Sequence, residues 1–462
     1  MAGNGERRRH TSGAGRLLEL VRTGAADTRV TLTRASGLAR ATVNDRLDLL
    51  LEAGLLSPNG AAASTGGRRA ASFAFNEGSG VVYVADLGAT HAVLAICDLG
   101  AHVIADERHA IDITAGPDVN LALVRDRLPD LLAAAGRTEA DVVAATIGVP
   151  GPVQSSPPRV VSPPIMTGWD DVVVPEALAL PLAVPVLVGN DVNLMALGEH
   201  RACFADHEHI IVVKVGTGVG SGIIVARSLH QGAEGAAGDI GHIPVPGIEE
   251  LCVCGKVGCV EAKAGGWAIA RDLRALGHGV SGTADVVTLV KRRDPDAIRL
   301  VNEGARMLGV AIADAVNVLN PSTVVLGGEI ALAHEHLLAH VREVVYTRSL
   351  PLATRSLNVV VSTLGDRSGV LGGAYLAIEQ RLAPDALDRE LDRRLAGDAA
   401  LNAWGDAGER QRRRGREAVK WRVAARPRAV WSVVVNYSRQ VTTPPPGTAD
   451  NLGPVASLPR RR

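Results

Sequence analysis

Four residues of the kinds that bind zinc lie close together in the stretch HIPVPGIEELCVCGKVGC, which begins at position 242. It holds three of the chain's five cysteines within eight residues, and a histidine ten positions before the first of them. One imidazole and three thiolates form a closed tetrahedral zinc shell that leaves no position for water. Two glycines between the thiols permit the backbone angles that a loop wrapped around one ion requires. We therefore predict a structural zinc ion bound by His242, Cys252, Cys254 and Cys259.

Two carboxylates flank this predicted zinc loop. Asp239 lies three residues before the histidine, and Glu261 lies two residues after the last cysteine. A metal ion that fixes both ends of the loop would aim both carboxylates at a common point. Because a carboxylate accepts hydrogen bonds from hydroxyl groups, this arrangement suits a sugar. The alternatives are solvated surface acids and buried cysteines that bind no metal.

The composition indicates a globular protein of several domains. The chain has 462 residues, of which 47% are hydrophobic and 21% are charged, so two or three domains are expected. It contains no apolar run of about 18 residues, and no apolar run follows the arginines near the start, which predicts neither a membrane span nor a secretory signal. We expect a cytoplasmic protein, in which thiols stay reduced and clustered cysteines bind metal.

Charge is distributed unevenly along the chain although the formal net charge is zero. Lys and Arg number 11 against 6 Asp and Glu in residues 1–76, 22 against 34 in residues 77–382, and 16 against 9 in residues 383–462. A basic segment ahead of an acidic body suggests that only the first segment meets a polyanion. The last segment is rich in Pro, Gly and Arg and shows no periodicity, so we expect a disordered tail.

The N-terminal module, residues 12–76, has the pattern of a winged helix-turn-helix. GRLLELVRTG predicts one amphipathic helix, and TLTRASGLARATVNDRLDLLLEAGLL predicts two more, joined at Gly37. In the last helix Val43, Leu47 and Leu50 share one stripe and should face inward. The opposite face and the following GGRR stretch then offer groups for base edges, phosphates and a narrow minor groove. The predicted DNA contacts are Arg40, Thr42, Asn44, Asp45, Arg46, Arg68 and Arg69.

Within this set, Arg46 suits a phosphate contact, whereas Arg68 and Arg69 suit the minor groove. Ala39 stands where Ser would commonly cap the helix, which predicts a weak helix start. One such module rarely buries enough surface for specificity, so we expect a homodimer or homotetramer on double-stranded operator DNA. The alternative for the module is a three-helix unit that binds a protein.

The central region, residues 80–381, alternates β-branched runs with helical patterns, which predicts an α/β domain around a mainly parallel sheet. Two stretches, VVYVADLGATHAVLAICD and IIVVKVGTGVGSGIIVAR, share the plan of strand, Gly-rich turn and strand. They predict two related lobes that face a cleft. Asn190 and Asp191 follow a buried strand, where an α/β sheet presents groups to ligands. A helix cap is the other interpretation of this pair, and both can hold.

The zinc-loop pattern resembles that of a known family. AAGDIGH followed by C-x-C-G-x-x-G-C-x-E is similar to the loop of the ROK family (repressor, open reading frame, kinase), and the resemblance covers about residues 80–381 and continues into the N-terminal module. Its members are bacterial sugar kinases or sugar-responsive transcription factors with an actin-like, hexokinase-like pair of lobes. The resemblance implies that Asn190 and His242 contact the sugar, and that Asp191 is the catalytic base in a kinase. Asp239 stands where the family usually has Glu.

Two glycine-rich loops are candidates for binding nucleotide phosphates. The first departs from the D-x-G-G-T-K of the kinases, because Ala89 replaces the second Gly and His91 replaces the Lys, which argues against ATP-dependent phosphoryl transfer. We therefore expect a repressor of sugar-utilisation genes that responds to a sugar or sugar phosphate. The alternative is a sugar kinase that has kept a DNA-binding module. The residues assigned to the two loops are Asp86, Gly88, Thr90, Gly216, Thr217, Gly218 and Gly220.

Overall fold

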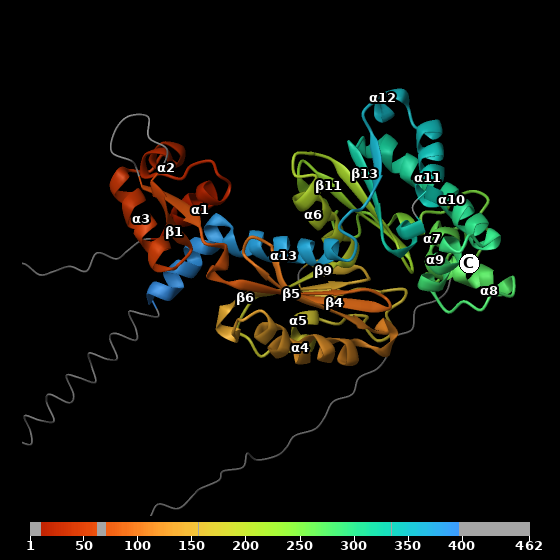
Figure 1. The fold of residues 1–462 in the computed structure, drawn as a ribbon, viewed down its shortest axis with the longest axis horizontal. Helices are drawn as coiled ribbons and strands as arrows, with labels where there is room; N and C mark the ends of the chain where they lie inside the picture. Colours follow the sequence, from red (N-terminus) through yellow and green to blue (C-terminus); the bar gives the residue numbers. More distant parts are fainter. Residues whose placement is uncertain (1–10, 62–70, 156, 334, 397–462) are drawn as a thin grey trace, which may run out of the picture. The chain divides into compact units, whose positions relative to one another are not determined.

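The N-terminal module consists of three helices and a β-hairpin (Figure 1). The computed structural model describes residues 11–61, 71–155, 157–333 and 335–396. The apolar sides of the three helices pack against one another, and Leu17, Leu32 and Leu47 are fully buried there. The predicted winged helix-turn-helix is thus confirmed. Its elements are α1 (Ala14–Arg22), α2 (Arg29–Ser36), α3 (Arg40–Glu52), β1 (Leu56–Ala61) and β2 (Ala71–Phe75).

The turn between α2 and α3 depends on a glycine. Gly37 has a φ of 70°, in the left-handed region that a side chain disfavours, and it ends α2. The start of α2 is stabilised by a capping box in which Thr28 and Thr31 bond each other's backbone N–H groups. In contrast, α3 begins at Ala39 without a side-chain cap, as predicted from the sequence.

The first lobe of the central region is built on a five-stranded sheet with the strand order β5-β4-β3-β6-β9. β4 runs antiparallel to both of its neighbours, β3 and β5, whereas β3, β6 and β9 run parallel. The apolar side chains of α4 pack on one face of this sheet and those of α13 on the other. The bounds are β3 (Val81–Leu87), β4 (His91–Asp98), β5 (Val103–Ala110), β6 (Val142–Val149), β9 (Val186–Asn190), α4 (Pro117–Ala134) and α13 (Arg367–Leu382).

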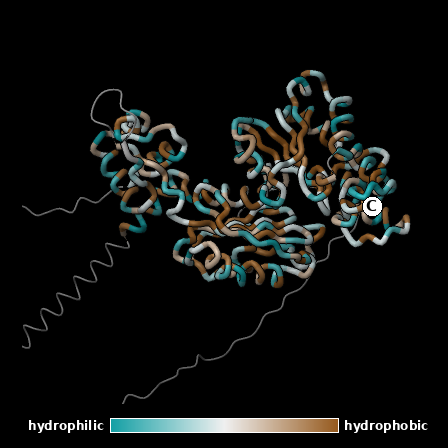
Figure 2. The backbone as a smooth tube through the Cα atoms, viewed as in Figure 1, coloured by the Kyte–Doolittle hydropathy of each residue, from teal (hydrophilic) through white to brown (hydrophobic). Residues whose placement is uncertain are grey.

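The second lobe repeats this plan, with a hairpin of β10 and β11 followed by parallel pairing to β13 and β14. Helices α10 and α11 cover one face of its sheet, and α6 covers the other. Figure 2 shows the hydrophobic strands of both sheets enclosed by these helices. The two-lobed α/β fold is therefore confirmed. The bounds are α6 (Asp191–Cys203), β10 (Ile210–Val215), β11 (Val219–Val225), β12 (Ser228–Leu229), α10 (Pro295–Leu319), β13 (Thr323–Gly327), α11 (Glu335–Arg348) and β14 (Asn358–Val361).

Shorter elements connect the two layered lobes and carry the loops described below. Within the described residues, no helix combines the length and the apolar character that crossing a membrane requires. The remaining elements are η1 (Glu77–Ser79), η2 (Ile113–Ala115), η3 (Glu139–Asp141), β7 (Val153–Ser155), β8 (Pro158–Val160), α5 (Val174–Leu178), η4 (Ile240–His242), α7 (Glu261–Ala264), α8 (Gly266–Ala275), α9 (Thr283–Lys291), η5 (Glu329–Ala333) and α12 (Pro351–Thr354).

The lobes are joined where α6 crosses α13, and both helices carry a glycine at the crossing. A Cβ atom on Gly198 would lie 2.0 Å from the carbonyl oxygen of Ser368, and one on Gly372 would lie 1.7 Å from that of Leu194. Because both obstacles are backbone atoms, no side-chain rotation could make room. The close approach of the two helices therefore requires glycine at both positions.

The C-terminal segment differs from the expectation of disorder from residue 383 onward. Residues 384–396 form a helix, whereas residues 397–462 lie outside the described part of the chain. Leu387 and Leu391 lie one turn apart and are buried in the same core cluster as Leu17. The carboxylate of Asp388 accepts hydrogen bonds from the backbone N–H groups of Gly13, at 2.7 Å, and Gly15, at 2.8 Å. The side chain of Asp388 on this helix therefore caps the start of α1, although the two are far apart in the sequence.

Replacing Asp388 by alanine is expected to lower the stability of the N-terminal module. Two N–H groups at the start of α1 would lose their acceptor, which costs about 1–2 kcal/mol for a helix cap. Urea denaturation followed by circular dichroism would measure the loss. Asp392→Ala is the matched control, because Asp392 is exposed on the same helix. Equal unfolding midpoints for the two variants would contradict the capping role.

Candidate functional site

A cleft of about 730 Å³ lies between the two lobes. On the first lobe it is lined at the carboxyl ends of β3, β6 and β9, where Asp86, Gly151 and Asn190 lie. On the second lobe it is lined by the β10–β11 hairpin and by the loop that contains the clustered cysteines. The predicted sugar residues and both glycine-rich loops therefore meet at one cleft, at the edge of the sheet where α/β proteins bind ligands.

Asn190 both caps a helix and lines the cleft. Its Oδ1 accepts hydrogen bonds from the backbone N–H groups of Val192 and Asn193, each at 3.1 Å, at the start of α6. Its Nδ2 donates to the carbonyl oxygen of Gly151 at 3.1 Å. The helix-cap interpretation is thus confirmed. The same bonds fix the side chain at the wall of the cleft.

Lys214 is a cleft residue that the sequence interpretation missed. Its Nζ lies 2.6 Å from Oδ2 of Asp191, whose side chain is 7% exposed. Burial alone would lower the pKa of Lys214, but the negative charges of Asp191 and Asp86 outweigh that effect and raise it. The sequence did contain a sign of this pairing: a single charged residue stands within the otherwise apolar strand IIVVKV, and a buried charge requires a partner.

Asp86 lies at the end of β3 in the same part of the cleft. Burial raises its pKa to about 6, while the charge of Lys214 lowers it and that of Asp191 raises it further. Its Oδ1 is buried and makes no hydrogen bond among the described residues. The start of α13 approaches it closely, because a Cβ atom on Gly369 would lie 1.9 Å from Oδ2.

Asp86→Asn is expected to stabilise the protein at alkaline pH. The folded-state pKa of about 6 lies above the ordinary value of 3.8, so ionisation of this carboxyl opposes folding as pH rises through that range. The neutral amide should raise the free energy of unfolding at pH 8 by about 3 kcal/mol, and the gain should shrink toward zero near pH 4. Denaturation at both pH values checks this, with the exposed Asp106→Asn as control. A gain that is independent of pH would contradict the raised pKa.

The two glycine-rich loops border the same cleft. All seven residues assigned to them line it: Asp86, Gly88, Thr90, Gly216, Thr217, Gly218 and Gly220. His91, at the kinase lysine position, has its pKa lowered to about 4 by burial and by the charges of Arg108 and Lys214. It is therefore neutral near pH 7 and supplies no fixed cation.

The clustered cysteines and His242 have the spacing of a tetrahedral metal site. The Sγ atoms of Cys254 and Cys259 are 3.7 Å apart, and Nδ1 of His242 lies 3.6 Å from Sγ of Cys252. All four candidate ligand atoms lie within 4.8 Å of one another. A tetrahedral shell with metal–sulfur bonds of about 2.3 Å separates sulfur atoms by about 3.8 Å, so this group can hold a metal ion. Gly255 and Gly258 have φ values of 84° and 89°, which are the backbone angles unfavourable to side chains that the sequence led us to expect in this loop.

The flanking carboxylates occupy different environments. Asp239 has a side chain that is 54% exposed, and its Oδ1 lies 4.0 Å from Nε2 of His242. Glu261 is 6% exposed, and its oxygens accept hydrogen bonds from the N–H of Val219, at 2.8 Å, and from Nε1 of Trp267, at 3.3 Å. Both residues line the cleft. Asp239 is thus the more accessible of the two, while Glu261 also holds the β10–β11 hairpin.

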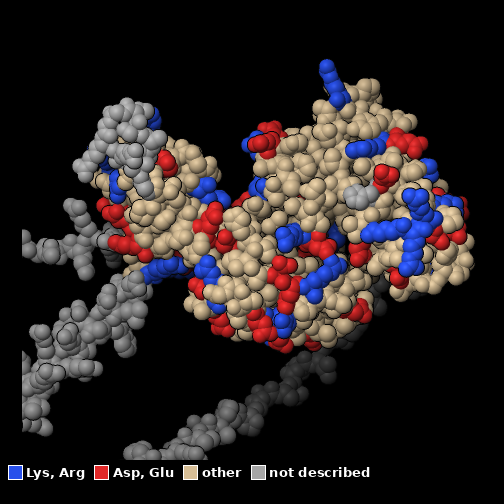
Figure 3. Space-filling view, in the orientation of Figure 1, with Lys and Arg blue, Asp and Glu red and all other residues tan. Residues whose placement is uncertain are grey.

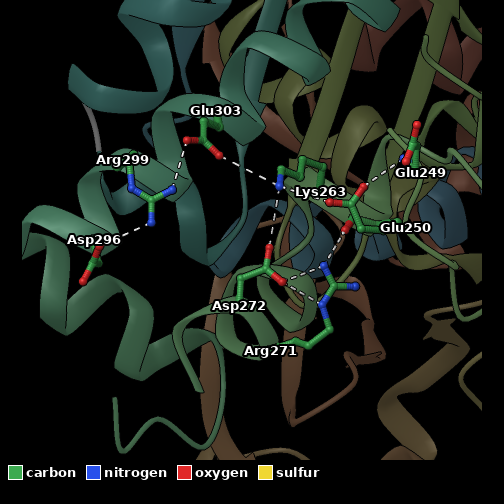
Figure 4. Close-up of polar contacts among 9 residues, drawn as sticks. Glu249, Glu250, Lys263, Arg271, Asp272, Asp296, Arg299 and Glu303 are labelled. Carbon is green, nitrogen blue, oxygen red and sulfur yellow. Dashed lines mark hydrogen bonds and ion pairs between the residues drawn. The ribbon is translucent and has the colours of Figure 1, made fainter. Parts of the chain in front are cut away.

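An ion-pair network fastens the cysteine loop to the helices behind it (Figure 4). Nζ of Lys263 lies 3.2 Å from Glu250 of the loop, 3.8 Å from Asp272 of α8 and 3.9 Å from Glu303 of α10. Arg299 extends the network by pairing with Glu303 at 3.1 Å. Single surface pairs contribute little to stability, but one cation shared by three elements restricts how the loop can move. Figure 3 shows basic and acidic side chains beside each other elsewhere on the drawn face as well.

The predicted DNA-contacting residues fall into three groups. Arg40 and Asp45 are exposed on α3, and Thr42 and Asn44 are half-buried there. Arg46 differs from its expected phosphate contact, because it is 8% exposed and its Nε donates to the carbonyl oxygen of Ser12 at 3.0 Å. It is held within the module, and we do not include it among the proposed DNA contacts. Arg68 and Arg69 lie outside the described residues.

Comparisons with known proteins agree with this architecture. The model of the ROK family matches residues 82–380. The chain is 30% identical over 366 residues to the N-acetylglucosamine repressor of Escherichia coli O6:H1, covering 77% of this chain and 89% of that protein. It is 28% identical over 369 residues to the xylose repressor of Caldicellulosiruptor bescii, covering 77% and 92%.

A solved structure extends the likeness to the three-dimensional fold. It is a ROK family transcriptional regulator described as a homologue of the Escherichia coli MLC protein, and it superposes with a TM-score of 0.70 at 25% sequence identity. The superposition covers 83% of this chain and 99% of that one, which is more than the two lobes alone. The cleft, the cysteine loop and these matches together show that the chain belongs to the ROK family.

Proposed function

We propose that this protein is a cytoplasmic transcriptional repressor of sugar-utilisation genes that releases operator DNA when a sugar binds in the interlobe cleft. The observation that carries this proposal is the presence, in one chain, of a winged helix-turn-helix and a ROK cleft lined by hydrogen-bonding side chains. Two relatives that are named as repressors support it, and the matches to this chain cover about nine-tenths of each relative's length.

The proposed sugar site combines residues from both lobes. Sugar hydroxyls would contact the side chains of Asn190 and Asp191 on one side, and those of Asp239, His242 and Glu261 on the other. The metal ion would be zinc, bound by His242 together with Cys252, Cys254 and Cys259. Its role would be structural: with Nδ1 of His242 turned toward Cys252, Nε2 is left for the sugar.

The proposed link between sugar and DNA is helix α13. Its first turn includes Gly369, which lines the cleft, and its last turn includes Leu382, which is buried in the same cluster as Leu17 and Leu50 of the N-terminal module. A change in lobe closure at the cleft would therefore move the last turn of α13, which shares a buried cluster with α1 and α3. In a homodimer or homotetramer, such movement would alter the spacing of paired α3 helices on the operator.

An ATP-dependent sugar kinase is the second candidate. The presence of the 216–220 loop and Asp191 in the same cleft favours it. The ion pair of Asp191 with Lys214, and Ala89 and His91 in the first loop, count against it. Incubation with ATP and a panel of hexoses tests it, since phosphate transfer that Asp191→Ala abolishes would promote this candidate.

The DNA-binding part of the proposal is tested with the DNA upstream of the protein's own gene. Arg40→Ala should weaken binding about tenfold or more, because Arg40 is exposed at the start of α3 and loses a contact to a base or phosphate. Arg22→Ala removes the same charge from an exposed position on α1 and serves as the matched control. Mobility-shift titrations at two salt concentrations measure both. Binding that neither Arg40→Ala nor salt weakens would contradict the proposal.

A further inference from the structure

The interlobe cleft carries a cation of its own, Lys214, beside the buried carboxylate of Asp191. Nζ of Lys214 lies 2.6 Å from Oδ2 of Asp191, and the charge of Lys214 also acts on Asp86. Two neighbouring carboxylates without a cation either retain a proton or recruit a divalent ion. Lys214 removes that need, because it stands one residue before the end of β10, lines the cleft and pairs with Asp191.

The remaining charges of the cleft are predominantly negative. Among the described residues the cleft has three Lys or Arg side chains: Lys214 pairs with Asp191, Arg108 pairs with Asp366, and Lys256 is exposed and forms no ion pair. The acidic side chains outnumber the basic ones by six to three. They are Asp86, Asp191, Asp239, Glu261, Glu329 and Asp366.

We propose that the ligand of this cleft is an uncharged sugar, and that Lys214 is a built-in counter-ion that takes the place of a divalent cation between Asp86 and Asp191. This inference rests on the proposed function and narrows its effector from sugars and sugar phosphates to uncharged sugars. Hydroxyl groups can donate hydrogen bonds to a carboxylate whose charge Lys214 balances. A phosphate ester would bring about two further negative charges into a cleft in which two of the three cations, Lys214 and Arg108, are already paired.

The first test compares uncharged sugars with their phosphate esters on the full-length protein. Isothermal titration with D-xylose, D-glucose and N-acetylglucosamine, and with xylose 5-phosphate, glucose 6-phosphate and N-acetylglucosamine 6-phosphate, measures each affinity. At least one uncharged sugar should bind, and its own ester should bind at least about tenfold more weakly. Added Mg²⁺ should change neither affinity. An ester that binds as tightly as its parent sugar, or a sugar that binds only with Mg²⁺, would overturn the inference.

The second test alters the counter-ion. Lys214→Met should weaken binding of the uncharged sugar at least about tenfold at pH 8. At pH 5.5 the variant should regain part of the lost affinity, because one of the two carboxyl groups regains its proton. The same variant should take up Mn²⁺, detected by loss of the free-ion electron paramagnetic resonance signal. Lys214→Arg keeps the charge and should stay closer to the original protein. A methionine variant that binds sugar normally and takes up no Mn²⁺ would contradict the role of Lys214.

The outcomes separate this inference from the proposed function. If an ester binds more tightly than its parent sugar and releases operator DNA, the inference fails and the repressor function stands. If an uncharged sugar binds without affecting operator DNA, the repressor function fails and the inference stands. If no member of the panel binds, both are overturned. A methionine variant that does not fold leaves the comparison of sugars and esters on the original protein to decide.

Discussion

Cys259→Ser is expected to remove the metal ion and to disorder the loop from His242 to Cys259. The thiol of Cys259 is fully buried and lies 3.7 Å from that of Cys254, so the serine hydroxyl would leave a closed four-ligand shell incomplete. Structural zinc contributes roughly 10–16 kcal/mol in small zinc domains, which makes this the largest effect of any single substitution here. Elemental analysis should show metal falling from one ion per chain to near zero.

The control for this substitution is Cys203→Ser, because Cys203 is exposed and lies outside the cluster. It should keep its metal and its sugar affinity, whereas Cys259→Ser should lose both. The loss of sugar binding follows because Asp239 and His242 would no longer be held at the cleft wall. A protein that contains no metal in freshly prepared, reduced form would contradict the metal site.

Gly372→Ala is expected to cause the second-largest effect, on the crossing of α6 and α13. Its new methyl group would lie 1.7 Å from the carbonyl oxygen of Leu194, so the two helices would have to move apart. We expect a loss of about 3 kcal/mol or more in the free energy of unfolding, measured by urea denaturation. Because this crossing joins the lobes, sugar affinity should fall as well.

Gly279→Ala provides the matched control for the glycine substitution. No atom lies within 4 Å of a Cβ placed on Gly279, so the change adds a methyl group in open space. Its effect should stay within about 1 kcal/mol and could be slightly favourable, since alanine restricts the unfolded chain. Similar losses for the two variants would show that the helix crossing tolerates a side chain.

The sequence was most informative where the decisive residues are neighbours in the chain. The candidate metal ligands span residues 242–259, and the two positive-φ glycines among them suit a loop that turns around one point. The inward stripe of α3 was equally readable, since Val43, Leu47 and Leu50 repeat with the helical period and are fully buried. The Asn190–Asp191 pair was located by the strand that precedes it.

The missed features depend on contacts between distant parts of the chain. Asp388 caps α1 across 375 positions, and nothing near residue 388 indicates which helix it will meet. The pairing of Lys214 with Asp191 arises only when the start of α6 packs beside β10, 23 positions along the chain. Arg46 shares the polar side of α3 in a helical projection, yet the chain before α1 covers it. Spacing within one element therefore predicts faces, while tertiary packing decides which polar groups are used internally.

The most direct test of the account is fluorescence anisotropy of labelled upstream DNA, titrated with the protein in the absence and presence of the sugar that binds the cleft. We predict that the sugar raises the Kd for DNA at least about tenfold, and that DNA weakens sugar binding by the same factor, as linkage requires. Arg40→Ala should reduce DNA binding without altering sugar affinity. Sugar that binds the protein and leaves its affinity for DNA unchanged would contradict the central claim.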